Sequence, residues 1–252
     1  MPLLDHLIEL RNRLMWAIGA VLVAFLICYQ FKERIYGFLV HPLAVIFEGQ
    51  TGRHLIYTGL TEAFFTYVKV SFWAGLCVAF PIVASQIWKF VAPGLYKKEK
   101  RAILPFICAT PVLFLMGASL AYFVAIPMAL HYLLSFQGNL GGVQQEALPS
   151  MGNYLNFVMQ FMFGFGIAFL MPVLLMLIER AGIVTRKQLV QFRRYAIVAN
   201  TAIAAVLAPP DVGSMILLGV PLILLYEVAL IGIWLTERRR ARTEASVPAA
   251  VE

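Results

Sequence analysis

Charged residues are scarce in this sequence. Asp, Glu, Lys and Arg make up 13% of the 252 residues, whereas hydrophobic residues make up 61%. A chain of this length and composition has room for one membrane domain with short connections, and it leaves no room for a second, soluble domain. The composition therefore indicates a membrane protein.

The sequence also lacks the common motifs of metal binding, cofactor binding and catalysis. Its three cysteines lie singly in or beside apolar runs without CxxC spacing, and its four histidines form no HExxH or paired arrangement. No GxSxG nucleophile elbow, P-loop or Gly-rich dinucleotide loop occurs, and the apolar runs hold no nucleophile with a matching base. We therefore expect no metal, no cofactor and no enzymatic activity.

What the sequence has instead is six apolar stretches, most of them long enough to cross a hydrocarbon core of about 30 Å as helices. The expected spans are residues 14–31, 63–88, 103–136, 154–178, 195–208 and 214–235. We predict an all-α integral membrane protein with one six-span domain over residues 1–235, and a disordered cytoplasmic tail over residues 236–252. The first run has no cleavage-site pattern, so we expect it to be retained as a span.

The basic residues predict the orientation in the membrane. All but four of the twenty Lys and Arg residues fall before the first span, between the second and third, between the fourth and fifth, or after the sixth. By the positive-inside rule these segments, and both termini, are cytoplasmic. Topology therefore explains the net charge of +7, and a nucleic-acid partner is not expected because the charges do not cluster with aromatic residues on one element.

Prolines interrupt several of the expected spans. The third run is about 34 residues, longer than a hydrocarbon core requires, and Pro105, Pro111 and Pro127 are candidate bends within it. Pro81 and Pro172 should bend the second and fourth spans in the same way, because proline lacks an amide donor and crowds the preceding turn.

The last two spans are short. The fifth ends at Pro209-Pro210, and the sixth is interrupted by Pro221 and Glu227. We expect this pair to thin the bilayer locally or to lie at a slant. On the opposite face, residues 36–47 are amphipathic and predict a short helix at the outer interface. The Gly- and Gln-rich segment 137–150 predicts a flexible connection.

Four local sequences resemble TatC, the multispan subunit of the twin-arginine protein translocase. They are HLIELRNRL at residues 6–14, QIWKFVAPGLYKKEKR at 86–101, GASLAYF at 117–123 and PPDV at 209–212. The resemblance extends over nearly the whole chain up to about Leu235. It implies six helices in a concave, glove-like arrangement in the inner membrane of a bacterium, without catalytic chemistry.

The same resemblance implies partners and binding residues. Members of this family bind the twin-arginine signal peptides of folded cargo, recruit the single-span subunits TatA and TatB, and associate with further copies of themselves. The membrane proton gradient drives the transport of the cargo. The family's signal-recognition segments match Leu10, Arg11, Phe90 and Glu99 in this sequence. Pro42 and Asp211 also match positions that the family uses.

Two carboxylates allow both a plain and a functional interpretation. Glu99 lies among four basic residues, so in the plain interpretation it balances the charge of a loop that orients the protein. In the functional interpretation it accepts a bidentate pair of hydrogen bonds from a guanidinium of the signal peptide, a geometry that lysine reproduces poorly. Glu9 can pair with Arg13 at i, i+4, which stabilises a helix by a few tenths of a kcal/mol. Alternatively, Glu9 and Glu99 together offer two carboxylates to two arginines. Both interpretations stay open for each residue.

Two residues of the types Asp, Glu, Lys and Arg fall inside the expected spans. Lys69 and Glu227 are costly there unless they pair, reach the interface or face a wet groove. We therefore regard both as candidates for partner docking or structural roles.

The chain departs from the family pattern at three positions. Relatives generally carry an acidic or amide side chain where this chain has Leu170, Gln where it has Met215, and Thr where it has Ala208. Gln160 and Asn200 are candidates to compensate in part. Because an interhelical hydrogen bond in a membrane contributes about 0.6 to 2 kcal/mol, we predict weaker partner assembly, with signal-peptide binding retained better than transport.

The principal alternative function is a small-solute secondary transporter. Proline-broken spans and intramembrane charges favour it. However, the two halves of the sequence show no obvious inverted repeat, and few polar residues converge on a shared groove. The sequence therefore favours a translocase receptor and scaffold.

Overall fold

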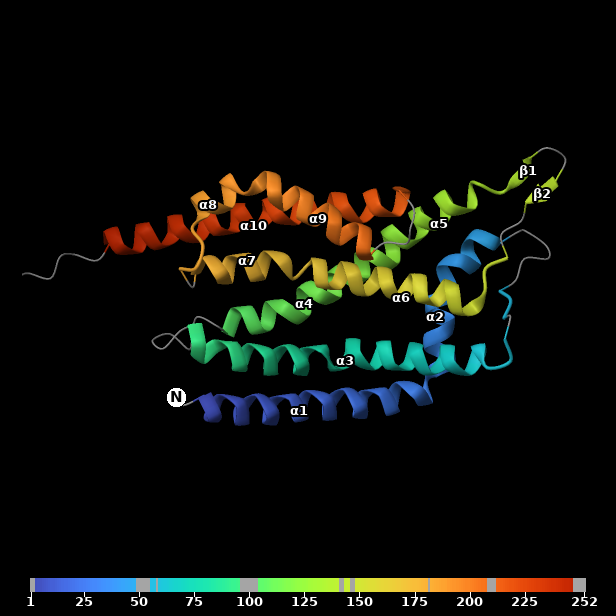
Figure 1. Ribbon diagram of the computed structural model, residues 1–252, viewed down its shortest axis with the longest axis horizontal. Helices are drawn as coiled ribbons and strands as arrows, with labels where there is room; N and C mark the ends of the chain where they lie inside the picture. The colour runs from blue at the N-terminus through green and yellow to red at the C-terminus, as the bar shows by residue number, and fades with distance from the viewer. Residues whose placement is uncertain are drawn as a thin grey trace, which may run out of the picture.

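The computed structural model describes residues 3–48, 55–57, 59–95, 104–140, 143–145, 148–180, 182–207 and 212–246. Within these residues the protein is almost entirely helical (Figure 1). Five helical stretches are long and apolar enough to cross a membrane: Leu7–Gln30, Glu62–Phe90, Phe106–Leu134, Met151–Arg180 and Val212–Arg238. The prediction of an all-α integral membrane protein is confirmed.

The first two spans form a pair of adjacent helices. Helix α1 (Leu3–Gln30) lies along α3 (Glu62–Leu95), and the chain runs in opposite directions in the two (Figure 1). A Cβ atom at Gly75 would lie 2.7 Å from the backbone nitrogen of Phe25, so this close approach requires glycine. Ala24 and Cys28 are buried in the same interface. Small residues at the contact are what helix pairs in a bilayer use, because burial from lipid gives no hydrophobic gain.

The third span consists of three segments: α4 (Leu104–Leu120), a π-helical turn η2 (Ala121–Ala125) and α5 (Ile126–Leu134). The hydrogen-bonding pattern changes immediately before Pro127, one of the expected irregularities, since proline cannot donate to the preceding turn. By contrast, Pro111 lies inside α4 and Pro81 inside α3 without interrupting either helix.

The fourth span is divided as expected near Pro172. Two residues separate helix α6 (Met151–Ala168) from α7 (Met171–Arg180), and Pro172 occupies the first turn of α7, where a missing amide costs nothing. The start of α6 is capped: the hydroxyl of Ser150 accepts from the amide of Asn153, and the carboxylate of Glu62 accepts from the amide of Gly152 at 2.8 Å. Helix α6 is the centre of the main hydrophobic core.

Two small elements cover the end of the molecule opposite the N-terminus (Figure 1). The expected helix over residues 36–47 is part of α2 (Lys32–Phe47), which buries Leu39, Pro42 and Leu43. The expected flexible connection over 137–150 instead contains an antiparallel hairpin of β1 (Gly138–Leu140) and β2 (Val143–Gln145). The prediction was wrong for these strands because three-residue strands leave no periodic pattern in a sequence.

The C-terminal part contains α8 (Arg186–Gln191), α9 (Arg193–Leu207) and α10 (Val212–Ser246). Helix α9 is 15 residues long and overlaps the expected fifth span, 195–208, but it is not one of the five helical stretches long and apolar enough to cross a membrane. Helix α10 continues through residues 236–246, so a disordered tail beginning at Thr236 is wrong for this segment. Its Glu, Arg and Ala residues are strong helix formers, and extending an existing helix avoids the cost of nucleation.

The helices form successive layers: α1 with α3, then α4 with α6 and α7, then α9 with α10 (Figure 1). The N-terminus, the end of α3, α8 and the end of α10 lie at one end of the molecule. The basic residues at the start of α1, near the end of α3, in α8 and near the end of α10 therefore lie at the same end as the N-terminus.

Candidate functional site

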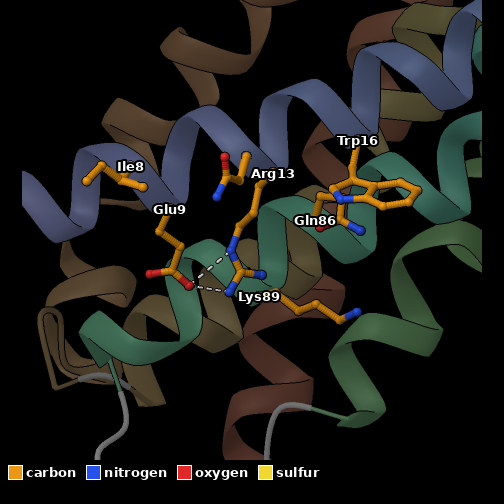
Figure 2. Close-up of a pocket in the computed structure, with 7 residues that line it drawn as sticks. Ile8, Glu9, Arg13, Trp16, Gln86 and Lys89 are labelled. Atoms are coloured by element: carbon orange, nitrogen blue, oxygen red, sulfur yellow. Dashed lines mark hydrogen bonds and ion pairs between the residues drawn. The ribbon is translucent and has the colours of Figure 1, made fainter.

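A pocket of about 580 Å³ lies between the first turns of α1 and the last turns of α3 (Figure 2). Residues three and four apart on a helix share one face, and the opposite directions of α1 and α3 bring the start of one beside the end of the other. The lining residues are Ile8, Glu9, Asn12, Arg13 and Trp16 from α1, and Gln86 and Lys89 from α3.

An ion pair between two residues of α1 lies on one wall of this pocket. The Nε atom of Arg13 donates to Oε1 of Glu9 at 3.1 Å, and Nη2 of Arg13 donates to the same oxygen. About a quarter of each side chain is exposed, 26% for Glu9 and 22% for Arg13. Lys89 is exposed on the opposite wall. The pocket therefore combines one carboxylate with two cations, beside the apolar surface of Trp16.

The predicted signal-binding residues that the structure describes do not all lie in this pocket. Glu9 lines the pocket, whereas Leu10 is exposed to the side, and Arg11 lines a neighbouring groove. Phe90 follows Lys89 on α3 and is half-buried without lining the pocket. Glu99 lies outside the described residues, and so do Asp211 and Ala208.

Sequence reasoning did not assign a binding role to Asn12, Trp16 or Gln86, and it treated Arg13 and Lys89 mainly as determinants of topology. A helical spacing links the three residues of α1 to Glu9, because Asn12, Arg13 and Trp16 continue the same face of that helix. That spacing could have been used to predict these three residues from the sequence. The contact of this face with α3 could not be predicted, since it depends on how the two helices pack.

A second, larger hollow continues from the pocket along the side of the helix pair. We call it the lateral groove; its volume is about 1060 Å³, and Asn12 and Trp16 line both hollows. Apart from Arg11 and Asn12, its lining is apolar. The lining residues are Arg11, Asn12, Met15, Trp16, Gly19, Ala20, Val23, Ala24 and Ile27 of α1, and Val78, Ala79 and Ile82 of α3.

The two charged residues inside the spans have different surroundings. Glu227 on α10 is paired: Nε of Arg193 lies 2.8 Å from Oε1 and Nη2 lies 2.9 Å from Oε2. Lys69 is exposed and lines a polar hollow of about 500 Å³ at the end of the molecule opposite the N-terminus, together with Asn153 and Asn156 of α6. No ion pair of Lys69 occurs among the residues that the structure describes.

The remaining docking candidates are dispersed. Gln160 is exposed on α6, and Met215 of α10 is half-buried against the main core. Leu170 lines an apolar cavity of about 140 Å³ with Trp88. Asn200 is buried and donates to the carbonyl of Leu222 at 3.4 Å, so it is engaged within the protein. These residues do not form one site.

Comparisons with known proteins agree in pointing to one family. Residues 5–221 match the family described as Sec-independent protein translocase protein (TatC). The chain is 48% identical over 245 residues to the Sec-independent protein translocase protein TatC of Magnetococcus marinus, covering 97% of this chain and 88% of the relative. It is 41% identical over 232 residues to the protein of the same description from Desulforapulum autotrophicum, covering 92% and 83%.

Superposition on solved structures shows that the fold is also similar to members of this family. A crystal structure described as the twin-arginine translocase receptor TatC in DDM superposes with a TM-score of 0.79 at 37% identity, covering 90% of this chain and 98% of that one. A second crystal structure of the twin-arginine translocase receptor TatC gives a TM-score of 0.76 at 38% identity.

Proposed function

Because this chain belongs to the TatC family of Sec-independent protein translocase proteins, we propose that it binds the twin-arginine signal peptides of folded proteins and recruits TatA and TatB for their export. The single observation that carries the proposal is the pocket between α1 and α3, which brings Glu9 beside Lys89, ten residues before Glu99 in the sequence. The similar crystal structures are described as translocase receptors, which supports the same role here.

The chemistry of the pocket suits a guanidinium ligand. Glu9 already accepts two donors from Arg13 at Oε1, and a carboxylate has lone pairs for more than one guanidinium. An arginine of the signal peptide would bind the carboxylate in a planar, bidentate manner, which a lysine ammonium does not reproduce. Because Arg13 and Lys89 repel an incoming cation, a second carboxylate is needed, and we assign that role to Glu99.

The remaining parts of the proposal concern the membrane and the partners. We place the end of the molecule that holds the N-terminus on the cytoplasmic side of a bacterial inner membrane, since basic residues of α1, α3, α8 and α10 gather there. Helix α9, with 15 residues, would then be a short fifth span of a six-span, glove-like protein. Lys69 and Gln160 are exposed on their helices and are candidates for docking TatA, TatB or another copy.

Binding of a labelled twin-arginine signal peptide to the purified protein in nanodiscs tests the proposal. The comparison includes a twin-lysine peptide and the variants Glu9→Gln and Glu99→Ala, with the exposed residue Glu33 on α2 changed to Gln as a control. We expect tight binding only for the twin-arginine peptide, and weaker binding to Glu9→Gln and Glu99→Ala. Equal binding of both peptides to all proteins would overturn the receptor function and favour a small-solute transporter.

A further inference from the structure

We propose that the hollow beside Lys69 binds the headgroup of a zwitterionic phospholipid that carries a phosphodiester and a primary ammonium, as phosphatidylethanolamine does. The hollow, called the Lys69 hollow below, has a volume of about 500 Å³ and lies at the end of the molecule opposite the N-terminus (Figure 1). Glu62, Phe65 and Lys69 line it from α3, and Asn153 and Asn156 line it from α6. The inference requires a membrane location only and goes beyond the proposed function.

The two helices that form the Lys69 hollow begin at one level. The carboxylate of Glu62, the first residue of α3, accepts from the amide of Gly152, the second residue of α6, at 2.8 Å. The span that begins at Glu62 has 29 residues, or roughly 42 Å of helix at about 1.5 Å per residue. A bilayer with its headgroup regions is about 40–45 Å thick, and its hydrocarbon core is about 30 Å thick. The first two turns of both helices therefore cross the headgroup region of one leaflet and enter the hydrocarbon.

Lys69 is a cation at the inner limit of this headgroup region. It follows Glu62 by seven residues, about 10 Å along the helix, so its backbone lies just inside the hydrocarbon. A lysine at such a depth directs its ammonium back toward the headgroups. Among the residues that the structure describes, the Lys69 ammonium has no hydrogen bond or ion pair. A phosphate of the lipid is an anionic partner at the depth that this ammonium reaches.

Two amides on the opposite wall of the Lys69 hollow add further donors. Asn153 and Asn156 are exposed and three residues apart, so they share one face of α6. A polar side chain left without a partner beside hydrocarbon is costly. Phosphate oxygens accept strongly from an ammonium and also accept from amides, so one phosphodiester would satisfy Lys69 and both asparagines.

Glu62 selects a headgroup that carries both signs of charge. Its carboxylate lines the same hollow as Lys69, so it repels a free phosphate or an anionic headgroup. A carboxylate accepts more hydrogen bonds than the one from Gly152, and a primary ammonium can donate to it. A choline headgroup has no N–H to donate, and a glycerol headgroup has no cation. The Lys69 hollow should therefore prefer ethanolamine to both.

The rim of the Lys69 hollow favours a lipid over a soluble phosphate ester. Phe65 lines the hollow with 57% of its surface exposed, and Leu60, two residues before α3, is 99% exposed. Exposed aromatic side chains at this level are typical of the membrane interface, where they contact the acyl chains below a headgroup. A water molecule occupies about 30 Å³, so the hollow has room for a whole headgroup and not only for an ion.

Native mass spectrometry of the full chain in detergent tests the inference, with phosphatidylethanolamine, phosphatidylcholine and phosphatidylglycerol added at equal concentrations. Lys69→Met removes the cation. The matched control is Lys32→Met, because Lys32 begins α2 at the same end of the molecule and its ammonium lies 4.3 Å from the ring centroid of Tyr29, outside the hollow. Asn156→Leu removes one donor and leaves both charges, so it tests the site if Lys69→Met does not fold.

We expect the unchanged protein to retain phosphatidylethanolamine in preference to the other two lipids. Lys69→Met should bind it about ten-fold more weakly, because a charge-assisted hydrogen bond is lost. Asn156→Leu should also bind it more weakly, whereas Lys32→Met should bind it as the unchanged protein does. Glu62→Gln removes the repulsion and should therefore bind phosphatidylethanolamine and phosphatidylglycerol equally.

Three results would overturn the inference. The first is equal retention of all three lipids by the unchanged protein and by Lys69→Met. The second is competition by soluble glycerophosphoethanolamine as effective as that of the lipid, which would assign the hollow to a soluble phosphodiester. The third is a loss of self-association in Lys69→Met with unchanged lipid retention, which would show that another copy docks at Lys69. Because the assay contains no signal peptide, a failure of the proposed function leaves its outcome unaffected.

Discussion

The hydroxyl of Tyr122 donates a 2.6 Å hydrogen bond to the backbone carbonyl of Phe38. In a helix that carbonyl would accept from the residue four positions later, which is Pro42 and has no N–H. The rings of Tyr122 and Phe38 also stack, with centroids 4.3 Å apart. Tyr122 therefore satisfies the acceptor that proline leaves open and ties α2 to the π-helical turn η2.

Tyr122→Phe should destabilise the protein because it leaves the carbonyl of Phe38 without a partner. The expected cost is about 1–3 kcal/mol, the usual penalty for an unsatisfied buried polar group. Chemical or thermal unfolding in detergent measures it. In a Pro42→Ala background the restored amide of residue 42 satisfies the same carbonyl, so Tyr122→Phe should cost less there; equal costs in both backgrounds would contradict this coupling.

Glu62 supports the start of α6 by accepting from the amide of Gly152 at 2.8 Å. Glu62→Ala should lower the free energy of unfolding by about 0.5–2 kcal/mol, as the loss of a helix cap does. Glu62→Gln keeps an acceptor oxygen and loses only the charge, so it should recover part of this stability. A Gln variant as unstable as the Ala variant would show that the charge and not the hydrogen bond matters.

The pair of Arg193 and Glu227 joins α9 to α10. Arg193→Met should destabilise the protein because it leaves a carboxylate unpaired in an apolar span. The double variant Arg193→Met with Glu227→Gln should be more stable than Arg193→Met alone, because no unpaired charge remains. A double-variant cycle on unfolding in lipid measures the coupling, and strictly additive effects would mean that the pair contributes nothing.

Leu170 bears on transport more than on binding, because the family resemblance places a polar residue at this position. Leu170→Gln should increase export of a twin-arginine cargo into inverted membrane vesicles, and should leave the affinity for the signal peptide unchanged. The control Ile167→Gln changes an exposed residue of the preceding turn, which is not part of the lining of the cavity beside Leu170. Full export by the unchanged chain would contradict the prediction.

The membrane helices could be predicted because a bilayer leaves the backbone few choices. Every amide and carbonyl in hydrocarbon must be satisfied within its own helix, so a long apolar run indicates a helix almost by itself. The break beside Pro172 and the irregular turn before Pro127 follow from the missing amide donor of proline. The paired strands β1 and β2 and the extension of α10 to Ser246 were missed because polar segments carry no such constraint.

The candidate site was predicted only in part. Glu9 could be proposed as a ligand of a guanidinium from its charge and position. Trp16, Gln86 and the lateral groove could not, because no local pattern says which face of α1 meets α3. That choice depends on close contacts such as the one between Gly75 and the backbone of Phe25.

The sequence by itself determined that this is a helical membrane protein and where its main spans lie. Each of these properties is a sum over single residues along the chain: hydropathy, charge and the missing donor of proline. Only the tertiary structure decided that Glu9 lies beside the end of α3, that Glu227 meets Arg193, and that a groove extends along α1. These features depend on how helices that are distant in the sequence align against one another. Small residues such as Gly75 decide that alignment, because they are the positions at which two backbones can approach closely.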